Sequence, residues 1–329
     1  INQYRPCGTG DTSSASNSYQ DDNGYYTGNI YYFKYEPLTW RVLDPNEGYV
    51  MCNKIIDSQA YQNFIYENES VFYNSLDCTS YAADWTTSSL RQWLNNDFYN
   101  TAFTTEEKEQ IRTSYLENKN TYSSIYNSND TYDIFFPISY YDAINSNYDF
   151  NSEAETDDTA RQMKGTDYTK CQGLMVCHDV DGSSKDTFGW WLRSPFGSGG
   201  ASDVDCDGFA YSNGFVTGTH RGVVPAFKFK SKTSTLDYKT IEFGSYPQSE
   251  VKDEALLSRL NGSLTDDMWV SYGYYSGSIE PENQFLGTAY SGYGSMKQGD
   301  WMKYADITYN GEKYRAVKFS VDFWRLFWL

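Results

Sequence analysis

The order of hydrophobic and polar positions divides the chain into strand-rich ends and a helical middle. Turn pairs such as Asp207-Gly208 and Asn213-Gly214 separate several of the later apolar runs, as short antiparallel hairpins require. The pattern predicts an α+β domain whose first and last strands meet in one sheet. The predicted strands are 31–35, 38–43, 48–53, 134–138, 174–177, 188–192, 201–205, 209–211, 215–217 and 223–230.

Apolar spacing and capping residues predict helices between these strands. The run WTTSSLRQWLNNDF at 85–98 places two leucines and a tryptophan three and four positions apart, on one helical face. Thr104 and Ser139 are each followed, three residues later, by an acidic residue, which is the spacing of a capping box. Residues 57–66 and 157–163 are predicted to form shorter helices.

A second unit is predicted after the main domain. IEFGSYPQSE at 241–250 reads as a strand with a turn, and 303–319 holds two alternating strands around Asn310-Gly311, the preferred pair for a type I′ hairpin. The predicted division is a linker or the end of a preceding repeat at 1–30, an α+β domain at 31–230, a linker at 231–240 and the start of a second repeat at 241–329.

Charge and composition narrow the classes of partner. The chain has 26 Lys and Arg against 44 Asp and Glu, a net charge of −18, so nucleic acid and anionic membranes are not expected as partners. Neither is membrane insertion. The 32 tyrosines, among many Asn, Ser, Asp and Gly residues, are typical of an extracellular or cell-surface binding protein. The alternative is that tyrosines simply occupy the exposed faces of strands, where aromatic residues are favoured.

Six cysteines occur without the paired spacing of a zinc site, and the chain has only two histidines, so zinc is not expected. In an exported protein some of them would form disulfides. Cys171 and Cys177 are the nearest couple in sequence. The alternative is that the cysteines stay unpaired, because a thiol behaves as a small buried hydrophobe.

The candidate binding surface is the Gly-rich span 198–221. Carboxylate, amide and phenol groups on Gly-rich loops are the directional groups and flat faces that a sugar or peptide site uses. The alternative is a set of exposed turns, in which Asp-Gly and Asn-Gly are only turn chemistry. The candidate ligand-binding residues are Asp203, Asp205, Asp207, Tyr211, Asn213 and His220.

A neighbouring segment, 178–186, has oxygen-bearing side chains spaced like part of a calcium loop. Asp179, Asp181 and Asp186 are the candidate calcium ligands, but no Glu completes the twelve-residue pattern. No cofactor is expected beyond this weak calcium signal.

The flanking run WWLRSP is predicted to be structural. Trp190, Trp191, Arg193 and Pro195 alternate across a strand, so the tryptophans pack and the arginine is held by carbonyls or a carboxylate.

Four segments together resemble a family of uncharacterised bacterial cell-surface domains. They are WTTSSLRQWLNNDF at 85–98, WWLRSP at 190–195, GVVPAF at 222–227 and IEFGSYPQS at 241–249. The family is similar to C-type-lectin-like and formylglycine-generating-enzyme-like folds. The resemblance implies a C-type-lectin-like α+β domain with short antiparallel strands and a helical middle, followed by a partial second repeat with a β-hairpin. Val224 stands where the family has an arginine.

The order of the motifs implies a tandem array. In the family the FGSYPQ motif opens a unit, so 241–329 resembles the beginning of a second copy. The chain therefore resembles a segment of a tandem repeat array, offset by part of a repeat. The apolar ending is expected to make contacts between subunits. The residues expected to mediate this self-association are Phe323, Trp324, Phe327 and Trp328.

The expected function is a binding or adhesion module that recognises a glycan or a protein. Two alternatives stay open: a structural repeat of a self-assembling surface array, and a glycoside hydrolase with a carboxylate pair. No nucleophile elbow, zinc-protease motif or phosphate loop occurs, so an enzyme is not expected. The formylglycine-generating relatives use reactive cysteines, and the Gly-rich span has only Cys206, so their activity is not carried over.

Overall fold

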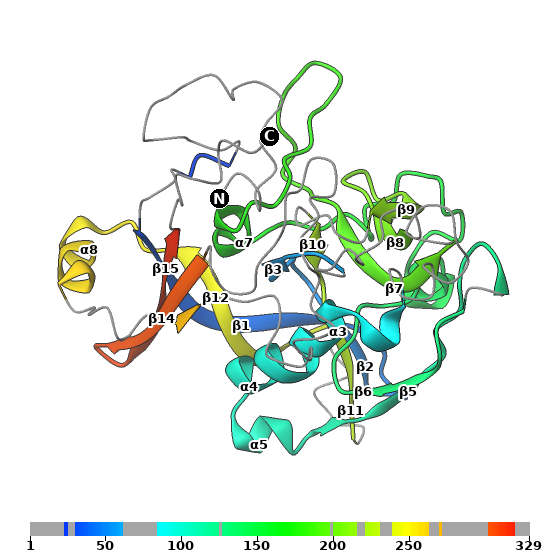
Figure 1. Ribbon diagram of the computed structural model, residues 1–329, viewed down its shortest axis with the longest axis horizontal. Coiled ribbons are helices and arrows are strands. Elements are labelled where there is room, and N and C mark those ends of the chain that lie inside the picture. Colours follow the sequence, from blue (N-terminus) through cyan, green and yellow to red (C-terminus); the bar gives the residue numbers. More distant parts are fainter. Residues whose placement is uncertain are drawn as a thin grey trace, which may run out of the picture.

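The computed structural model describes residues 23–25, 30–61, 84–124, 127–197, 200–215, 221–230, 239–262, 270–271 and 302–319. Within these ranges the strands form sheets of eight, five and two strands, with short helices between them (Figure 1). The fold is therefore α+β, as predicted, with strands predominating. No helix in the ranges above is long and apolar enough to cross a membrane.

The eight-stranded sheet is built around β1 (Ile30–Asp44), which has partners along both edges. β12 (Thr240–Glu250) pairs with one edge, whereas β15 (Glu312–Phe319) and then β2 (Tyr49–Cys52) share the other. In Figure 1 the yellow β12 and the red β15 lie against the blue β1. The remaining strands of this sheet are β4 (Ile111–Arg112), β11 (Ala226–Phe229), β13 (Val270–Ser271) and β14 (Met302–Tyr309).

The predicted meeting of the first and last strands of the main domain is confirmed. β11 pairs antiparallel with β2, which in turn pairs with β1. The predicted break between 31–35 and 38–43 is wrong, because β1 is continuous. Pro37 falls between the stretch paired with β15 and the stretch paired with β2, and next to a register shift against β12. Its missing N–H is tolerated there because no partner strand on that edge needs it.

The strand predicted to open a second unit lies in this same sheet. The Trp40 indole donates to the carbonyl of Phe243 at 2.7 Å, and the Gln248 amide donates to the carbonyls of Glu36 and Pro37 at 3.0 and 2.9 Å. Tyr246 is buried. Thus β12 contributes side chains to the core beneath β1.

The five-stranded sheet carries the motif segments of the second half of the main domain. Its order is β3-β10-β7-β8-β9, and only the β10–β7 pair is parallel. The strands are β3 (Asp57–Ser58), β7 (Trp190–Phe196), β8 (Gly200–Val204), β9 (Ala210–Phe215) and β10 (Gly222–Val223). A separate two-stranded sheet joins β5 (Ser114–Leu116) to β6 (Thr131–Asp133).

Helices occupy the middle of the chain, as predicted. The helix expected at 85–98 is confirmed as a succession of 3₁₀, α and π turns that continues to Ala102, and both capping boxes are formed. The helices are η1 (Trp85–Thr87), α3 (Ser89–Trp93), η2 (Leu94–Phe98), α4 (Tyr99–Ala102), α5 (Thr105–Lys108), α6 (Tyr140–Ala143), η4 (Ser146–Tyr148), α7 (Asp167–Cys171) and α8 (Glu254–Asn261).

Two of the weaker helix predictions are wrong. The helix predicted at 57–66 begins instead as strand β3, because Asp57 and Ser58 are buried and pair with β10; residues from 62 onward lie outside the described ranges. Residues 157–163 form turns. Arg161, which lies in this segment, is buried and donates hydrogen bonds to the surrounding backbone carbonyls. Tertiary pairing decides both cases against local propensity.

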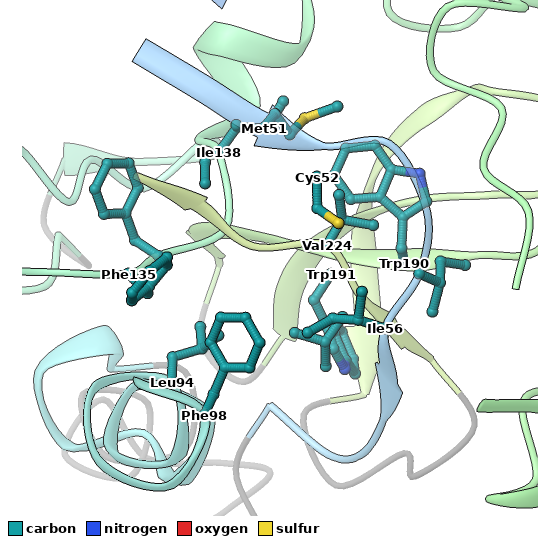
Figure 2. Close-up of a cluster of buried hydrophobic side chains, with 14 of the residues drawn as sticks. Met51, Cys52, Ile56, Leu94, Phe98, Phe135, Ile138, Trp190, Trp191 and Val224 are labelled. Atoms are coloured by element: carbon teal, nitrogen blue, oxygen red, sulfur yellow. The ribbon is translucent and has the colours of Figure 1, made fainter. Parts of the chain in front are cut away.

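The core is a layer of aromatic rings between the two larger sheets. Phe135 and Phe227 lie close to Trp40, with ring centroids 6.1 and 4.8 Å away. Figure 2 shows Trp190 and Trp191 entering the same core from β7, near Val224. All five of these aromatic side chains are fully buried. The core therefore joins elements from both halves of the main domain.

The β14–β15 hairpin predicted around Asn310-Gly311 is confirmed. Both residues have positive φ, 50° and 82°, as a type I′ turn requires. Asn and Gly are the residues that adopt this conformation at the lowest cost.

We expect Gly244→Ala to destabilise the whole main domain. Gly244 has φ +72°, and an added Cβ would lie 2.4 Å from the Phe103 ring and 3.0 Å from the carbonyl of Ala102. Left-handed strain and overpacking together should lower the free energy of unfolding by about 2–4 kcal/mol. The measurement is the urea midpoint followed by tryptophan fluorescence.

The matched control is Gly262→Ala, because Gly262 has negative φ and an added Cβ would make only ordinary contacts, the nearest at 3.7 Å. That variant should stay within about 0.5 kcal/mol of the parent. Equal midpoints for the two variants would show that β12 does not pack on the main domain.

Candidate functional site

Strand β7 is the structural base of the candidate site. The indole of Trp190 donates to the carbonyl of Arg161 at 3.0 Å, and that of Trp191 donates to the carbonyl of Gln59 at 2.9 Å. Both side chains are fully buried. Pro195 is also buried, and its carbonyl accepts the backbone N–H of Thr121 at 3.0 Å.

Arg193 ties strand β7 to the segment that follows β5. Its guanidinium donates to the Asn118 side-chain oxygen at 3.0 Å and to the carbonyls of Pro137 and Glu117 at 3.0 and 3.4 Å. It also lies over the Phe136 ring, 5.4 Å from the centroid. Carbonyls and an amide thus hold this buried charge, and the segment around Asn118 is fixed in return.

Asp203, the first predicted ligand-binding residue, forms a buried ion pair. Its carboxylate lies 2.8 Å from the guanidinium of Arg221 and is 3% exposed. Burial raises the pKa of Asp203, and the charge of Arg221 opposes that rise. Gly189 makes the pair possible, because an added Cβ there would lie 2.4 Å from the Arg221 guanidinium. The carboxylate of Asp203 is therefore buried and ion-paired.

Asp205 and Asp207 shape the turn between β8 and β9. The Asp205 carboxylate accepts the backbone N–H groups of Asp207 and Phe209, each at 2.9 Å, and burial raises its pKa. Asp207 forms an ion pair with Lys185, whose pKa is raised by that contact. These are the contacts of an anchored turn, as the turn-chemistry alternative expects.

The other predicted ligand-binding residues are only partly described. Tyr211 and Asn213 lie on β9, where Tyr211 is paired with Asp203 in the strand register. Their side chains, and the whole of His220, lie outside the described part of the chain.

The candidate calcium ligands have separate partners. Asp179 lies 3.2 Å from Lys185, and Asp186 lies 2.7 Å from Lys164. Asp181 accepts the backbone N–H and hydroxyl of Ser183 within the loop, at 2.9 and 2.7 Å. Across the described ranges, no three His, Cys, Asp or Glu side chains gather as a metal site would require.

A second candidate surface was not predicted from the sequence. It consists of large, strongly exposed aromatic side chains on β5, on β6, in the loop between them and on helix α6. We call it the tyrosine surface, and its members are Tyr115, Tyr122, Tyr132 and Tyr141, which are 48–72% exposed. The available signal was the alternation of exposed Tyr115 with buried Leu116 along β5.

Each of these four tyrosines has a contact with a neighbouring residue. Tyr115 and Tyr132 face each other across the β5–β6 pair, with ring centroids 5.4 Å apart. The Tyr122 ring lies 5.7 Å from that of Phe196, and the Tyr141 hydroxyl donates to the carbonyl of Asn120 at 3.4 Å. Tyr115 and Tyr132 therefore contact each other directly, whereas Tyr122 and Tyr141 contact Phe196 and Asn120.

Asn120 fixes the loop that bears Tyr122. Its side-chain oxygen accepts the backbone N–H groups of Tyr122, Ser123 and Gly197 at 2.8, 3.1 and 3.1 Å. Asn120 itself is buried. Because Gly197 directly follows β7, the same strand that holds Arg193 also positions this loop.

Polar side chains surround the rings of the tyrosine surface. The Tyr115 hydroxyl donates to Asp130, which raises the pKa of Tyr115 to about 12 and lowers that of Asp130. Glu117 and Lys119 form an exposed ion pair beside them, and the hydrogen bond with Glu117 raises the pKa of Lys119. Flat apolar faces thus alternate with hydrogen-bonding groups.

Arg161 is a structural residue that sequence patterns did not reveal. It is fully buried, and its guanidinium donates to six carbonyls at 2.5–3.3 Å. One of them belongs to Gly208, in the turn that Asp205 anchors. An added Cβ at Gly208 would lie 2.3 Å from the carbonyl of Asp158, so this turn is packed tightly on the Arg161 loop.

Comparison with known proteins gives one family. Residues 25–231 match the family model described as "Domain of unknown function (DUF6273)", which is well over half of the chain. No curated protein and no solved structure matches. The matched range contains the β8–β9 turn and the tyrosine surface.

We expect Arg221→Gln to make stability depend on the charge of Asp203. The variant leaves a buried carboxylate without its cation, so the folded-state pKa of Asp203 rises further above its unfolded value of about 3.9. The penalty is absent below that value and grows as the pH rises toward the new folded pKa. Urea unfolding should show a loss of about 2–4 kcal/mol at pH 7 and less than about 1 kcal/mol at pH 3.5.

Lys34→Gln is the control, because it removes an exposed pair with Glu312. Its effect should be below about 1 kcal/mol at both pH values. A pH-independent loss in Arg221→Gln would contradict the assignment of a charged, buried Asp203.

Proposed function

This chain belongs to the DUF6273 family of domains of unknown function, and we propose that it is an extracellular or cell-surface binding module that recognises a glycan or a protein. We also propose that its α+β fold is of the C-type-lectin-like type, on the support of its short antiparallel strands and helical middle. The function rests on one observation, the tyrosine surface.

The tyrosine surface has the composition of a recognition site. Tyrosine offers a large, rigid contact area at low entropic cost, together with a hydroxyl that can donate or accept a hydrogen bond. Four such rings, each about half exposed or more, lie on β5, on β6, in the loop between these strands and on α6. Residues of this size are usually at least partly covered in a folded domain, so an exposed group of them favours an interaction surface.

The tyrosines of this surface have rigid backbone support. This support favours a recognition site over the alternative that the tyrosines only occupy the exposed faces of strands. Arg193 and Asn120 fix the backbone that carries Tyr115 and Tyr122. A ligand would therefore meet side chains whose backbone is already ordered, which lowers the entropy lost on binding. The polar groups of Glu117, Lys119 and Asp130 would supply directional hydrogen bonds to a sugar ring or a peptide.

The segment with Asp203, Asp205 and Asp207 is less suited to ligand binding than the tyrosine surface is. Asp203 is buried against Arg221, Asp205 caps its own turn, and Asp207 is paired with Lys185. Ligand binding there would first have to break these contacts. The structure thus favours the tyrosine surface over the site predicted from composition.

Self-association and a location outside the cell stay predictions. Self-association was assigned to the terminal residues Phe323, Trp324, Phe327 and Trp328, which lie outside the described residues. Location outside the cell is supported by composition, namely the 32 tyrosines and the net charge of −18.

We expect the double variant Tyr122→Ala, Tyr132→Ala to lose ligand binding while the fold is kept. Exposed side chains contribute little to stability, so the urea midpoint should stay nearly unchanged. Loss of two aromatic contacts should weaken binding at least about tenfold. The measurement is a glycan array followed by calorimetry, with a surface-protein pull-down as the second arm.

Val180→Ser is the matched control, because Val180 is a fully exposed apolar residue outside the tyrosine surface, on the loop after α7. Its binding should equal that of the parent. Binding that survives in the tyrosine variant but fails in Tyr211→Ala, Asn213→Ala would move the site to β9.

A further inference from the structure

Two cysteines far apart in sequence meet beside the β8–β9 turn. The thiols of Cys177 and Cys206 are within hydrogen-bond contact, and both side chains are partly exposed. We propose that Cys177 and Cys206 are a redox-reactive pair that closes to a disulfide, which cross-links the loop after α7 to the turn between β8 and β9.

Hydrogen bonds on both sides of the pair hold the two segments in place. The backbone N–H of Lys185 donates to the carbonyl of Cys177 at 2.8 Å, and the Thr187 hydroxyl donates to the carbonyl of Cys206 at 2.8 Å. The Lys185 ammonium adds an ion pair to Asp207, the residue after Cys206. The two sulfurs are thus kept together before any bond forms between them, as ready formation of a disulfide requires.

The charges around the two thiols differ, which assigns each a role. The hydrogen bond from Cys206 and the positive charges of Arg221 and Lys185 lower the pKa of Cys177. The thiolate of Cys177 and the carboxylates of Asp205 and Asp207 raise the pKa of Cys206. Cys206 lies between two aspartates in the chain, Asp205 and Asp207, whose negative charges disfavour its thiolate. Because the thiolate is the reacting form, we expect Cys177 to attack first and Cys206 to resolve.

The oxidant is another disulfide, RSSR, which belongs to a small molecule or to a second protein. The Cys177 thiolate attacks one sulfur of this RSSR, a new S–S bond forms, and one RS⁻ leaves and takes up the proton that Cys177 lost. Cys206 then loses its proton to solvent or to RS⁻ and attacks Cys177, which releases the second RS⁻. In sum, two protein thiols are oxidised to one disulfide, and RSSR is reduced to two RSH.

The remaining described thiols give a contrast. Cys52 is fully buried, and burial raises its pKa to about 12. Cys171, the neighbour that is nearest to Cys177 in sequence, is buried on α7. The structure therefore assigns the partner of Cys177 to Cys206, whereas sequence proximity pointed to Cys171. Cys7 and Cys78 lie outside the described residues.

The test is oxidation of the folded, full-length chain by oxidised glutathione. Peptide mass spectrometry should identify one cross-linked peptide that joins Cys177 to Cys206. Closing a ring of about 30 residues should raise the thermal midpoint by roughly 5–15 °C, and dithiothreitol should reverse the shift. Recovery of both residues as alkylated thiols, or a cross-link from Cys177 to another cysteine, would overturn the proposal.

Serine variants separate the two roles. Cys206→Ser should stop at a glutathione adduct on Cys177, because no resolving thiol remains. Cys177→Ser should form an adduct on Cys206 more slowly, because the flanking carboxylates of Asp205 and Asp207 still disfavour the Cys206 thiolate. Cys52→Ala should still form the cross-link. Equal adduct rates in the two serine variants would overturn the assignment of Cys177 as the attacking thiol.

Discussion

The antiparallel pairing of β1 with β12 is the constraint on which the main sheet depends. It joins segments about two hundred residues apart and covers one edge of β1 from Phe33 to Arg41. Through this pairing Phe243 and Tyr246 reach the aromatic core, where Phe243 stacks on Phe227 and Tyr246 lies against Phe98. Without β12, β1 would expose a long unpaired edge and an uncovered aromatic layer. A segment outside the family match therefore completes the sheet of the matched domain.

Local chemistry could be predicted from the sequence. Among the distant pairings, only the meeting of the first and last strands of the main domain was predicted. The capping boxes at Thr104 and Ser139 and the Asn310-Gly311 turn each depend on residues a few positions apart, and all three are formed. The place of Asp57 in β3 depends on Gly222 and Val223, more than 160 residues away. Nothing in the local pattern around Asp57 carries that information, so capping propensity suggested a helix.

The candidate site shows the same division. Composition drew attention to Asp203, Asp205 and Asp207, but an acidic side chain in a Gly-rich loop can face solvent or a cation, and only the fold decides which. Here Arg221 and Lys185 decide it for Asp203 and Asp207. The exposed tyrosines were hidden among 32 tyrosines, of which Tyr61 and Tyr168 are fully buried. Tyrosine content indicated a recognition function, whereas the position of the exposed tyrosines depends on the fold.

Buried arginines explain how so much irregular backbone is held in place. Arg161 alone binds six carbonyls, five of them outside helices and strands, and Arg193 holds the segment that bears Tyr115. Each guanidinium gives up its hydration, but each offers five donors in a rigid fork, so the loss is offset by charge-assisted hydrogen bonds. Removing either side chain would leave several buried carbonyls without donors at once. The loops can therefore vary in sequence and display polar groups while their backbone stays fixed, which is what a recognition surface on an irregular scaffold requires.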